Sequence, residues 1–140
     1  MQFFEVDLKQ QFPCLTSQQQ PRLTCYINDN YKAVDEKRKN PAILIIPGGA
    51  YVFVSAQREG ESVAFNYLAK GFNAFVLNYS VKPEHYPQQL MEAAAAMIYI
   101  RENADKWNID TNKIAVNGYS AGGHLAASLG VFWNDPYMLD

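Results

Sequence analysis

Apolar runs that alternate with helical segments constrain the fold of this chain more than any other feature of its sequence. Two weaker strands are expected at 3–8 and 23–27, and strands and helices then alternate from Ala42 onward: strands 42–46, 72–79 and 113–117, and helices 58–70, 87–107 and 120–132. Short, continuous apolar runs are typical of central parallel strands that are buried on both faces. The alternation therefore predicts an α/β fold, with a mostly parallel sheet and helices on both of its faces.

Length and charge narrow the class of protein. The 140 residues suit one modest domain, and a composition of 49% hydrophobic and 19% charged residues is globular rather than disordered. The net charge of -2 provides no basic footprint, so neither a nucleic-acid partner nor a membrane partner is expected. No apolar stretch is long enough to cross a bilayer.

The start of the chain and its two cysteines bear on the compartment. Two acids within the first seven residues stand where a signal peptide would carry basic residues, so a cytoplasmic protein is expected. Cys14 and Cys25 have no metal-ligand spacing and are expected to be ordinary reduced thiols. The sequence implies no metal and no organic cofactor.

The pattern that carries chemistry is Gly118-Tyr-Ser-Ala-Gly122, a G-x-S-x-G sequence placed directly after a strand and directly before a helix. A sharp strand-to-helix turn presents the serine hydroxyl above the sheet, and the small residues at Gly118 and Gly122 prevent clashes. Ser120 is therefore the candidate nucleophile. The alternative is a glycine-rich turn in which Ser120 has only a structural role.

A second glycine-rich segment, Pro47-Gly-Gly-Ala-Tyr51, follows the strand 42–46. Functional groups of parallel sheets collect at the carboxyl ends of the strands, so this segment is expected beside Ser120. Acyl transfer needs N–H donors for the oxyanion of the tetrahedral intermediate. The candidates are the amides of Gly49, Ala50 and Ala121; the alternative is an ordinary turn at the end of a strand.

These residues resemble a known family. The segments 118–127, 47–51 and 78–87 are similar to those of α/β-hydrolase esterases related to hormone-sensitive lipase, in the bacterial branch called acetyl-xylan-esterase-like or Aes-type. The resemblance runs from about Ala42 to Leu129 and implies a carboxylesterase that acts on short-chain acyl esters, O-acetyl sugars among them. Pro47 replaces the usual histidine of H-G-G-G, and Ala50 replaces the last glycine, where its methyl group would narrow the acyl pocket.

A serine hydrolase of this fold carries its triad in the order Ser, then Asp or Glu, then His. The printed sequence has no such acid and histidine after Ser120, so residues 1–140 are expected to be the N-terminal part of a single α/β-hydrolase domain, truncated before its C-terminal strands. Asp135 and Asp140 are expected to lie toward the wrong end of the sheet. The expected pocket residues are Tyr51, Tyr119, His85 and His124.

His124 lies four residues after Ser120 on the same helical face, so its ring could approach the hydroxyl; a structural histidine is the alternative. His85 is expected to shape the pocket edge. Without a base, Ser120 is a weak nucleophile.

Two functions remain open. One is a serine esterase with a small ester as substrate. The other is a non-catalytic half-domain that needs a complementary C-terminal chain to supply the Asp and the His. The strand 113–117 would expose a bare edge in either case, which predicts pairing with such a chain or a homo-oligomer. A nucleotide-binding domain is disfavoured because the chain lacks G-x-G-x-x-G and a phosphate loop.

Overall fold

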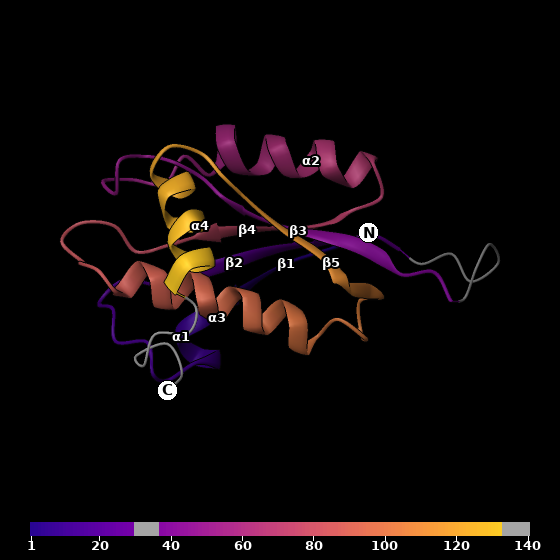
Figure 1. Cartoon of the computed structure of the whole chain (residues 1–140), viewed down its shortest axis with the longest axis horizontal. Helices are drawn as coiled ribbons and strands as arrows, with labels where there is room; N and C mark the ends of the chain where they lie inside the picture. Colours follow the sequence, from indigo (N-terminus) through magenta and orange to yellow (C-terminus); the bar gives the residue numbers. More distant parts are fainter. Residues whose placement is uncertain (30–36, 133–140) are drawn as a thin grey trace.

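The computed structural model describes residues 1–29 and 37–132 (Figure 1). They form a five-stranded sheet in the order β1-β2-β4-β3-β5. The strands are β1 (Gln2–Asp7), β2 (Arg22–Ile27), β3 (Asn40–Ile46), β4 (Asn73–Asn78) and β5 (Ile109–Gly118). β1 and β4 both pair antiparallel with β2, whereas β3 pairs parallel with β4 and β5. Only β2 therefore runs against the other described strands, and the mostly parallel sheet is confirmed.

The interior strand β3 explains how the two faces of the sheet are covered. Its residues from Ala42 to Ile46 are all buried, and they alternate between two hydrophobic clusters. Leu44 and Ile46 face the larger cluster, whereas Ile43 and Ile45 face the smaller one. A strand buried on both faces needs apolar residues at every position, which is why its sequence runs without alternation.

The helices cover both faces, as the sequence predicts. α2 (Ser62–Ala69) packs over the smaller cluster, and α3 (Gln88–Glu102) and α4 (Ala121–Phe132) pack over the larger one. Figure 1 shows α2 on one side of the sheet and α3 on the other, with α4 running from the end of β5 toward α3. Among the described helices, none is long and apolar enough to cross a membrane.

Several element boundaries differ from the prediction, each for a local reason. Leu8 belongs to a short helix, α1 (Leu8–Gln11), because the Asp7 carboxylate accepts the N–H groups of the next turn. A π-helical turn, η1 (Gln57–Glu61), replaces the start of the helix predicted at 58–70. The helix predicted to reach residue 107 ends at Glu102. β5 begins at Ile109 rather than at residue 113, because Ile109 already pairs with Asn40.

The buried face of α3 also differs from the predicted one. Helical spacing in the sequence puts five residues on one stripe of this helix, and the structure fully buries only the first of them: Leu90, Ala94, Met97, Ile98 and Arg101. The other expected members instead line an open groove of about 600 Å³ together with β5 and α4: Ala94, Met97, Ile98 and Arg101. β5 is the last strand of the sheet order, so its outer edge pairs with no described strand.

Candidate functional site

Three segments meet at the carboxyl ends of β3, β4 and β5, as expected for an open α/β sheet. They are the segment from Pro47 after β3, the segment from Tyr79 after β4, and the turn at Tyr119 and Ser120 after β5. This end of the sheet contains every residue that the sequence singled out for chemistry within the described ranges. Asp135 and Asp140 lie outside the described residues.

Ser120 occupies a strained turn between β5 and α4. Its φ is 53°, a left-handed conformation that non-glycine residues rarely adopt. A Cβ atom on Gly118 would lie 2.3 Å from the carbonyl oxygen of Gly122, and one on Gly122 would lie 2.0 Å from that of Ile46. Only glycine fits at these two positions, so the turn can pack directly against β3. The Ser120 side chain is exposed at the start of α4.

The segment after β3 turns sharply beside this serine. Gly49 has a φ of 142°, and both Ala50 and Tyr51 are left-handed, at 56° and 59°. A Cβ atom on Gly48 would lie 2.6 Å from the carbonyl oxygen of Tyr119 and 3.1 Å from the Cβ of Ser120. The glycine at 48 therefore allows this segment to pack against the Ser120 turn. The candidate donors Gly49 and Ala50 follow Gly48 in the chain, and the candidate donor Ala121 follows Ser120.

Two further hydrogen bonds hold this segment to the chain that follows β4. The Tyr79 hydroxyl donates to the carbonyl oxygen of Pro47 at 2.5 Å, and the Lys82 N–H donates to that of Tyr51 at 2.8 Å. Burial raises the pKa of Tyr79 to about 12, so its hydroxyl stays protonated at neutral pH and remains a donor. The sequence analysis missed Tyr79, although a polar residue at the end of a buried strand is a usable signal.

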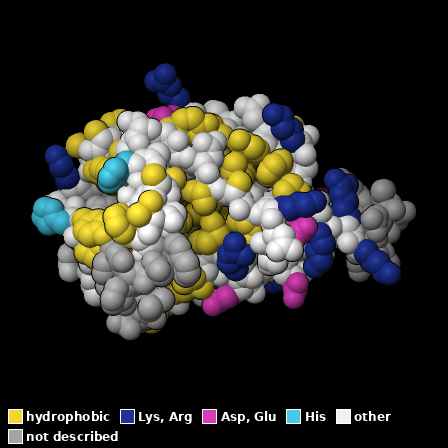
Figure 2. All heavy atoms as spheres, viewed as in Figure 1, with side chains coloured by type: hydrophobic (Ala, Val, Ile, Leu, Met, Phe, Trp, Pro, Cys, Tyr) yellow, Lys and Arg dark blue, Asp and Glu magenta, His cyan; other side chains and the backbone are white. Residues whose placement is uncertain are grey.

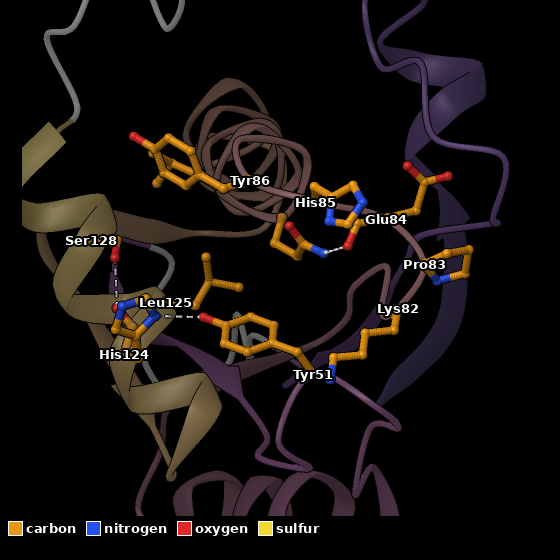
Figure 3. Close-up of a pocket in the computed structure, with 11 residues that line it drawn as sticks. Tyr51, Lys82, Pro83, Glu84, His85, Tyr86, His124, Leu125 and Ser128 are labelled. Atoms are coloured by element: carbon orange, nitrogen blue, oxygen red, sulfur yellow. Dashed lines mark hydrogen bonds between the residues drawn. The ribbon is translucent and has the colours of Figure 1, made fainter.

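A cavity of about 600 Å³ opens beside these segments (Figure 3). Its wall includes Tyr51, His85 and His124, three of the four residues predicted for the pocket. Tyr119 lies elsewhere: its ring packs against the cluster under α2, and its hydroxyl accepts a hydrogen bond from the Asn117 side chain at 3.3 Å. The remaining lining comes from the segment after β4 and from α3 and α4: Lys82, Pro83, Glu84, Tyr86, Gln89, Leu90, Leu125 and Ser128.

The sequence analysis expects the methyl group of Ala50 to narrow the acyl pocket. The expected narrowing of that pocket by the Ala50 methyl group does not appear in this cavity, because Ala50 is exposed and is not part of its wall.

His124 is engaged by Tyr51. The Tyr51 hydroxyl and His124 Nδ1 are 2.7 Å apart, and the two rings meet edge to face with centroids 5.9 Å apart. Burial raises the pKa of Tyr51, which keeps its hydroxyl protonated. Within residues 1–29 and 37–132, neither His85 nor His124 forms a hydrogen bond with the Ser120 hydroxyl. The described histidines therefore do not place a base on Ser120.

A buried carboxyl group, which the sequence analysis also missed, lies on α3. Glu92 on α3 is fully buried and accepts hydrogen bonds from the Ser80 N–H at 2.7 Å and from the Ser80 hydroxyl at 2.6 Å. Ser17 extends this network, with its hydroxyl 2.6 Å from that of Ser80. Burial raises the pKa of Glu92, and the two bonds from Ser80 oppose that shift. An acid directly before four alanines in a buried helix was the available signal.

Comparison with known proteins places this geometry in a family. BD-FAE matches residues 28–139 of the chain. Endo-1,4-beta-xylanase B of Butyrivibrio fibrisolvens is 38% identical over 120 residues, which cover 82% of this chain and 18% of that protein. Esterase LipC of Mycobacterium tuberculosis is 39% identical over 97 residues, which cover 69% of this chain and 24% of LipC. The chain thus spans a quarter or less of these curated relatives.

Solved structures agree with the sequence relatives. MGS-M1, an α/β hydrolase enzyme from a Medee basin deep-sea metagenome library, is 44% identical with a TM-score of 0.81, and the match covers 92% of this chain and 50% of that one. The acetyl ester-xyloside bifunctional hydrolase from Caldicellulosiruptor lactoaceticus is 35% identical with a TM-score of 0.80, covering 91% and 46%. The chain spans about half of each, and the resemblance to α/β-hydrolase esterases is confirmed. The chain belongs to the BD-FAE family and has the α/β-hydrolase fold.

Proposed function

We propose that the protein is a serine carboxylesterase that forms an acyl-enzyme at Ser120. The observation that carries this proposal is the packing of the glycine segment after β3 directly against the strained Ser120 turn. A hydroxyl that is exposed at a helix N-terminus, beside backbone amides at positive φ, is the arrangement that acyl transfer requires. Named relatives that hydrolyse esters support the same class of reaction.

The proposed reaction has two halves. Ser120 Oγ attacks the ester carbonyl carbon, its proton passes to a base, and the amides of Gly49, Ala50 and Ala121 stabilise the oxyanion. The intermediate expels the alcohol, which takes up the proton, and water then hydrolyses the acyl-enzyme by the reverse sequence. Each oxyanion donor is expected to contribute about 10²–10³-fold to kcat.

The base and the acid that orients it are the missing parts. In this fold they follow the serine in the chain, on segments after later strands. The chain spans only about half of the solved structures it matches, so we propose that these residues belong to the half that this chain does not span.

The proposed substrate is a short-chain acyl ester, with O-acetyl sugars as the leading class. Support comes from the relatives named acetylxylan esterase, of Xylanibacter ruminicola, and acetyl ester-xyloside hydrolase. The cavity lined by Tyr51 and His124 combines apolar wall residues such as Leu90 and Leu125 with the hydroxyl of Tyr51, which suits the ring and hydroxyl groups of a sugar.

A fusion tests this proposal. Residues 1–132 joined to the half of MGS-M1 that this chain does not span should hydrolyse p-nitrophenyl acetate and release acetate from acetylated xylo-oligosaccharides. The same fusion with Ser120→Ala should lose at least about 10⁴-fold in kcat. Equal activity in both fusions would contradict the role of Ser120, and activity on p-nitrophenyl acetate alone would contradict the sugar ester.

A second candidate function is a non-catalytic half-domain that binds a complementary chain. The observation that favours it is the unpaired outer edge of β5 together with the open groove beside it, among the described residues. In Figure 2, hydrophobic side chains are visible on this face of the molecule. The groove lining is mainly apolar: Ile98 and Met97 of α3, Ile114 and Val116 of β5, and Leu129 of α4. A complementary chain that supplies a parallel strand, an acid and a histidine would complete the site, so the half-domain would then act as the serine esterase proposed above.

A further inference from the structure

We propose that Tyr51 and His124 form a brace, which we define as the hydrogen bond between these two side chains, and that the brace positions the amides of the 47–51 segment relative to the Ser120 turn. This inference rests on the proposed esterase function, because it concerns the alignment of that function's oxyanion donors. It assigns both side chains as positioning residues that act through backbone amides. Figure 3 shows the two side chains meeting at one wall of the cavity.

The backbone of this segment needs external support. Ala50 and Tyr51 are two consecutive left-handed residues, and neither is a glycine. Each such residue costs about 1–2 kcal/mol relative to an ordinary conformation, and such strain persists only where neighbouring contacts fix it. A segment that carries two of them would relax if its contacts were removed.

The other hydrogen bonds of the segment do not connect it to α4. Val52 and Ser55 donate back to Gly49 and Gly48, which closes the turn on itself. The bonds from Tyr79 and Lys82 hold it to the chain after β4. Among the described residues, the Tyr51–His124 bond is the only hydrogen bond between residues 47–56 and α4.

His124 transmits this constraint to the serine. The backbone N–H of His124 donates to the carbonyl oxygen of Ser120 at 3.0 Å, in the first turn of α4. We therefore expect the His124 side chain to move together with the Ser120 turn. On the other side, the Tyr51 ring is fixed by edge-to-face contacts with both His124 and Tyr79, at centroid distances of 5.9 and 6.0 Å. The brace therefore joins two rigid units that lie 73 residues apart in sequence.

The consequence for catalysis follows from the geometry of an oxyanion hole. Donors are effective only when they lie about 2.7–3.1 Å from the oxyanion, and a misplacement of about 1 Å costs on the order of 10²-fold. Gly49 and Ala50 belong to one unit, whereas Ser120 and Ala121 belong to the other. A bond that fixes the two units relative to each other acts on all of the proposed donors at once.

Amide hydrogen exchange on the full chain tests the brace without requiring activity. Tyr51→Phe and His124→Leu each remove the bond, whereas His124→Asn keeps a polar atom near the Nδ1 position. Tyr67→Phe, on α2 and outside the cavity, is the matched control. A net hydrogen-bond contribution of about 1 kcal/mol predicts roughly fivefold faster exchange at residues 48–52 in the two variants that lack the bond.

The expected pattern is faster exchange in Tyr51→Phe and His124→Leu, rates within about twofold of wild type in His124→Asn and Tyr67→Phe, and a double variant no faster than either single one. Unchanged exchange at residues 48–52 in both variants that lack the bond would overturn the brace. If Tyr51→Phe does not fold, the comparison of His124→Leu with His124→Asn decides the result. Ser120-dependent hydrolysis by the fusion enzyme is read separately. If the fusion shows no Ser120-dependent hydrolysis but the exchange pattern is as expected, the proposed esterase function is overturned and the Tyr51–His124 brace still stands.

Discussion

The glycines of this chain differ sharply in what surrounds them, and that difference ties single residues to the proposed site. Gly122 lies where a Cβ atom would come within 2.0 Å of the Ile46 carbonyl oxygen, whereas Gly130, on the same helix, has no described atom within 4 Å of such a Cβ. Backbone cannot move aside as a flexible side chain can. A glycine is therefore required at position 122 for the Ser120 turn to pack against β3.

Replacing each of these glycines with alanine should have opposite effects on stability. Gly122→Ala should lower the free energy of unfolding by about 1–3 kcal/mol, because the new methyl group overpacks against β3. Gly130→Ala should raise it by up to about 1 kcal/mol, because alanine is the better helix former. Urea denaturation of both variants checks this, and equal midpoints would show that the close approach at Gly122 is not real.

Glu92 predicts a pH dependence of stability. Burial raises its pKa in the folded state above the ordinary value of 4.5, so the folded protein holds this proton more tightly than the unfolded chain does. The stability from the protonated group is fully present below pH 4.5 and is lost as pH rises through the folded-state pKa. Glu92→Gln cannot titrate, so it should lack this change.

The measurement is the difference in unfolding free energy between wild type and Glu92→Gln, taken at several pH values. That difference should favour wild type most below pH 4.5 and shift toward the variant as the pH rises above that value. Other titrating groups are common to both proteins and cancel. A difference that stays constant over this range would show that the Glu92 proton is held equally in the folded and unfolded states.

At the scale of elements, the groove between α3, β5 and α4 is where the sequence and the structure disagree most. Helical spacing puts Met97 and Ile98 on one stripe of α3 with the buried Leu90. In the structure both line an open groove beside the unpaired edge of β5, although Met97 also packs against the larger cluster. Val116 on β5 is 36% exposed there. Apolar side chains beside an open strand edge favour pairing with another chain.

Val116→Lys should therefore reduce self-association of the isolated chain. The new charge would have to be buried in any contact that covers the groove, which disfavours that contact. Phe3→Lys is the matched control, since it removes an exposed apolar side chain from β1 at the opposite end of the sheet. Multi-angle light scattering should show a monomer for Val116→Lys and larger species for wild type and for Phe3→Lys. A wild-type chain that is monomeric at every concentration would contradict self-association through the groove and the edge of β5.

Elements whose environment is encoded locally could be predicted from the sequence. The buried strand β3, the strand–turn–helix around Ser120, and the helices on both faces follow from continuous apolar runs and from glycine spacing. Boundaries were harder, because β5 is extended to Ile109 by its pairing with Asn40, a contact distant in sequence. The site followed the same rule: its glycines are local signals, whereas the Tyr51–His124 and Tyr79–Pro47 bonds join residues that only the folded sheet brings together.

At the scale of the whole molecule, we propose that the chain holds one part of a reaction centre. The described residues pack Gly48 of the segment after β3 against the Ser120 turn, and they place no histidine in hydrogen-bond contact with the serine hydroxyl. The solved structures that match it are about twice as long. An α/β hydrolase draws its acid and histidine from later segments, so the proposed activity depends on chain that the present sequence does not span.

Labelling by a fluorophosphonate probe, with the modified peptide mapped by mass spectrometry, tests the role of Ser120 most directly. Three purified samples suffice: the 140-residue chain, the fusion of residues 1–132 to the half of MGS-M1 that this chain does not span, and the same fusion with Ser120→Ala. The account predicts that the fusion is labelled at Ser120, that the Ser120→Ala fusion is not labelled, and that the isolated chain reacts at least about 10²-fold more slowly because it lacks a base. Labelling of the fusion at another residue, or equal labelling of the Ser120→Ala fusion, would contradict it.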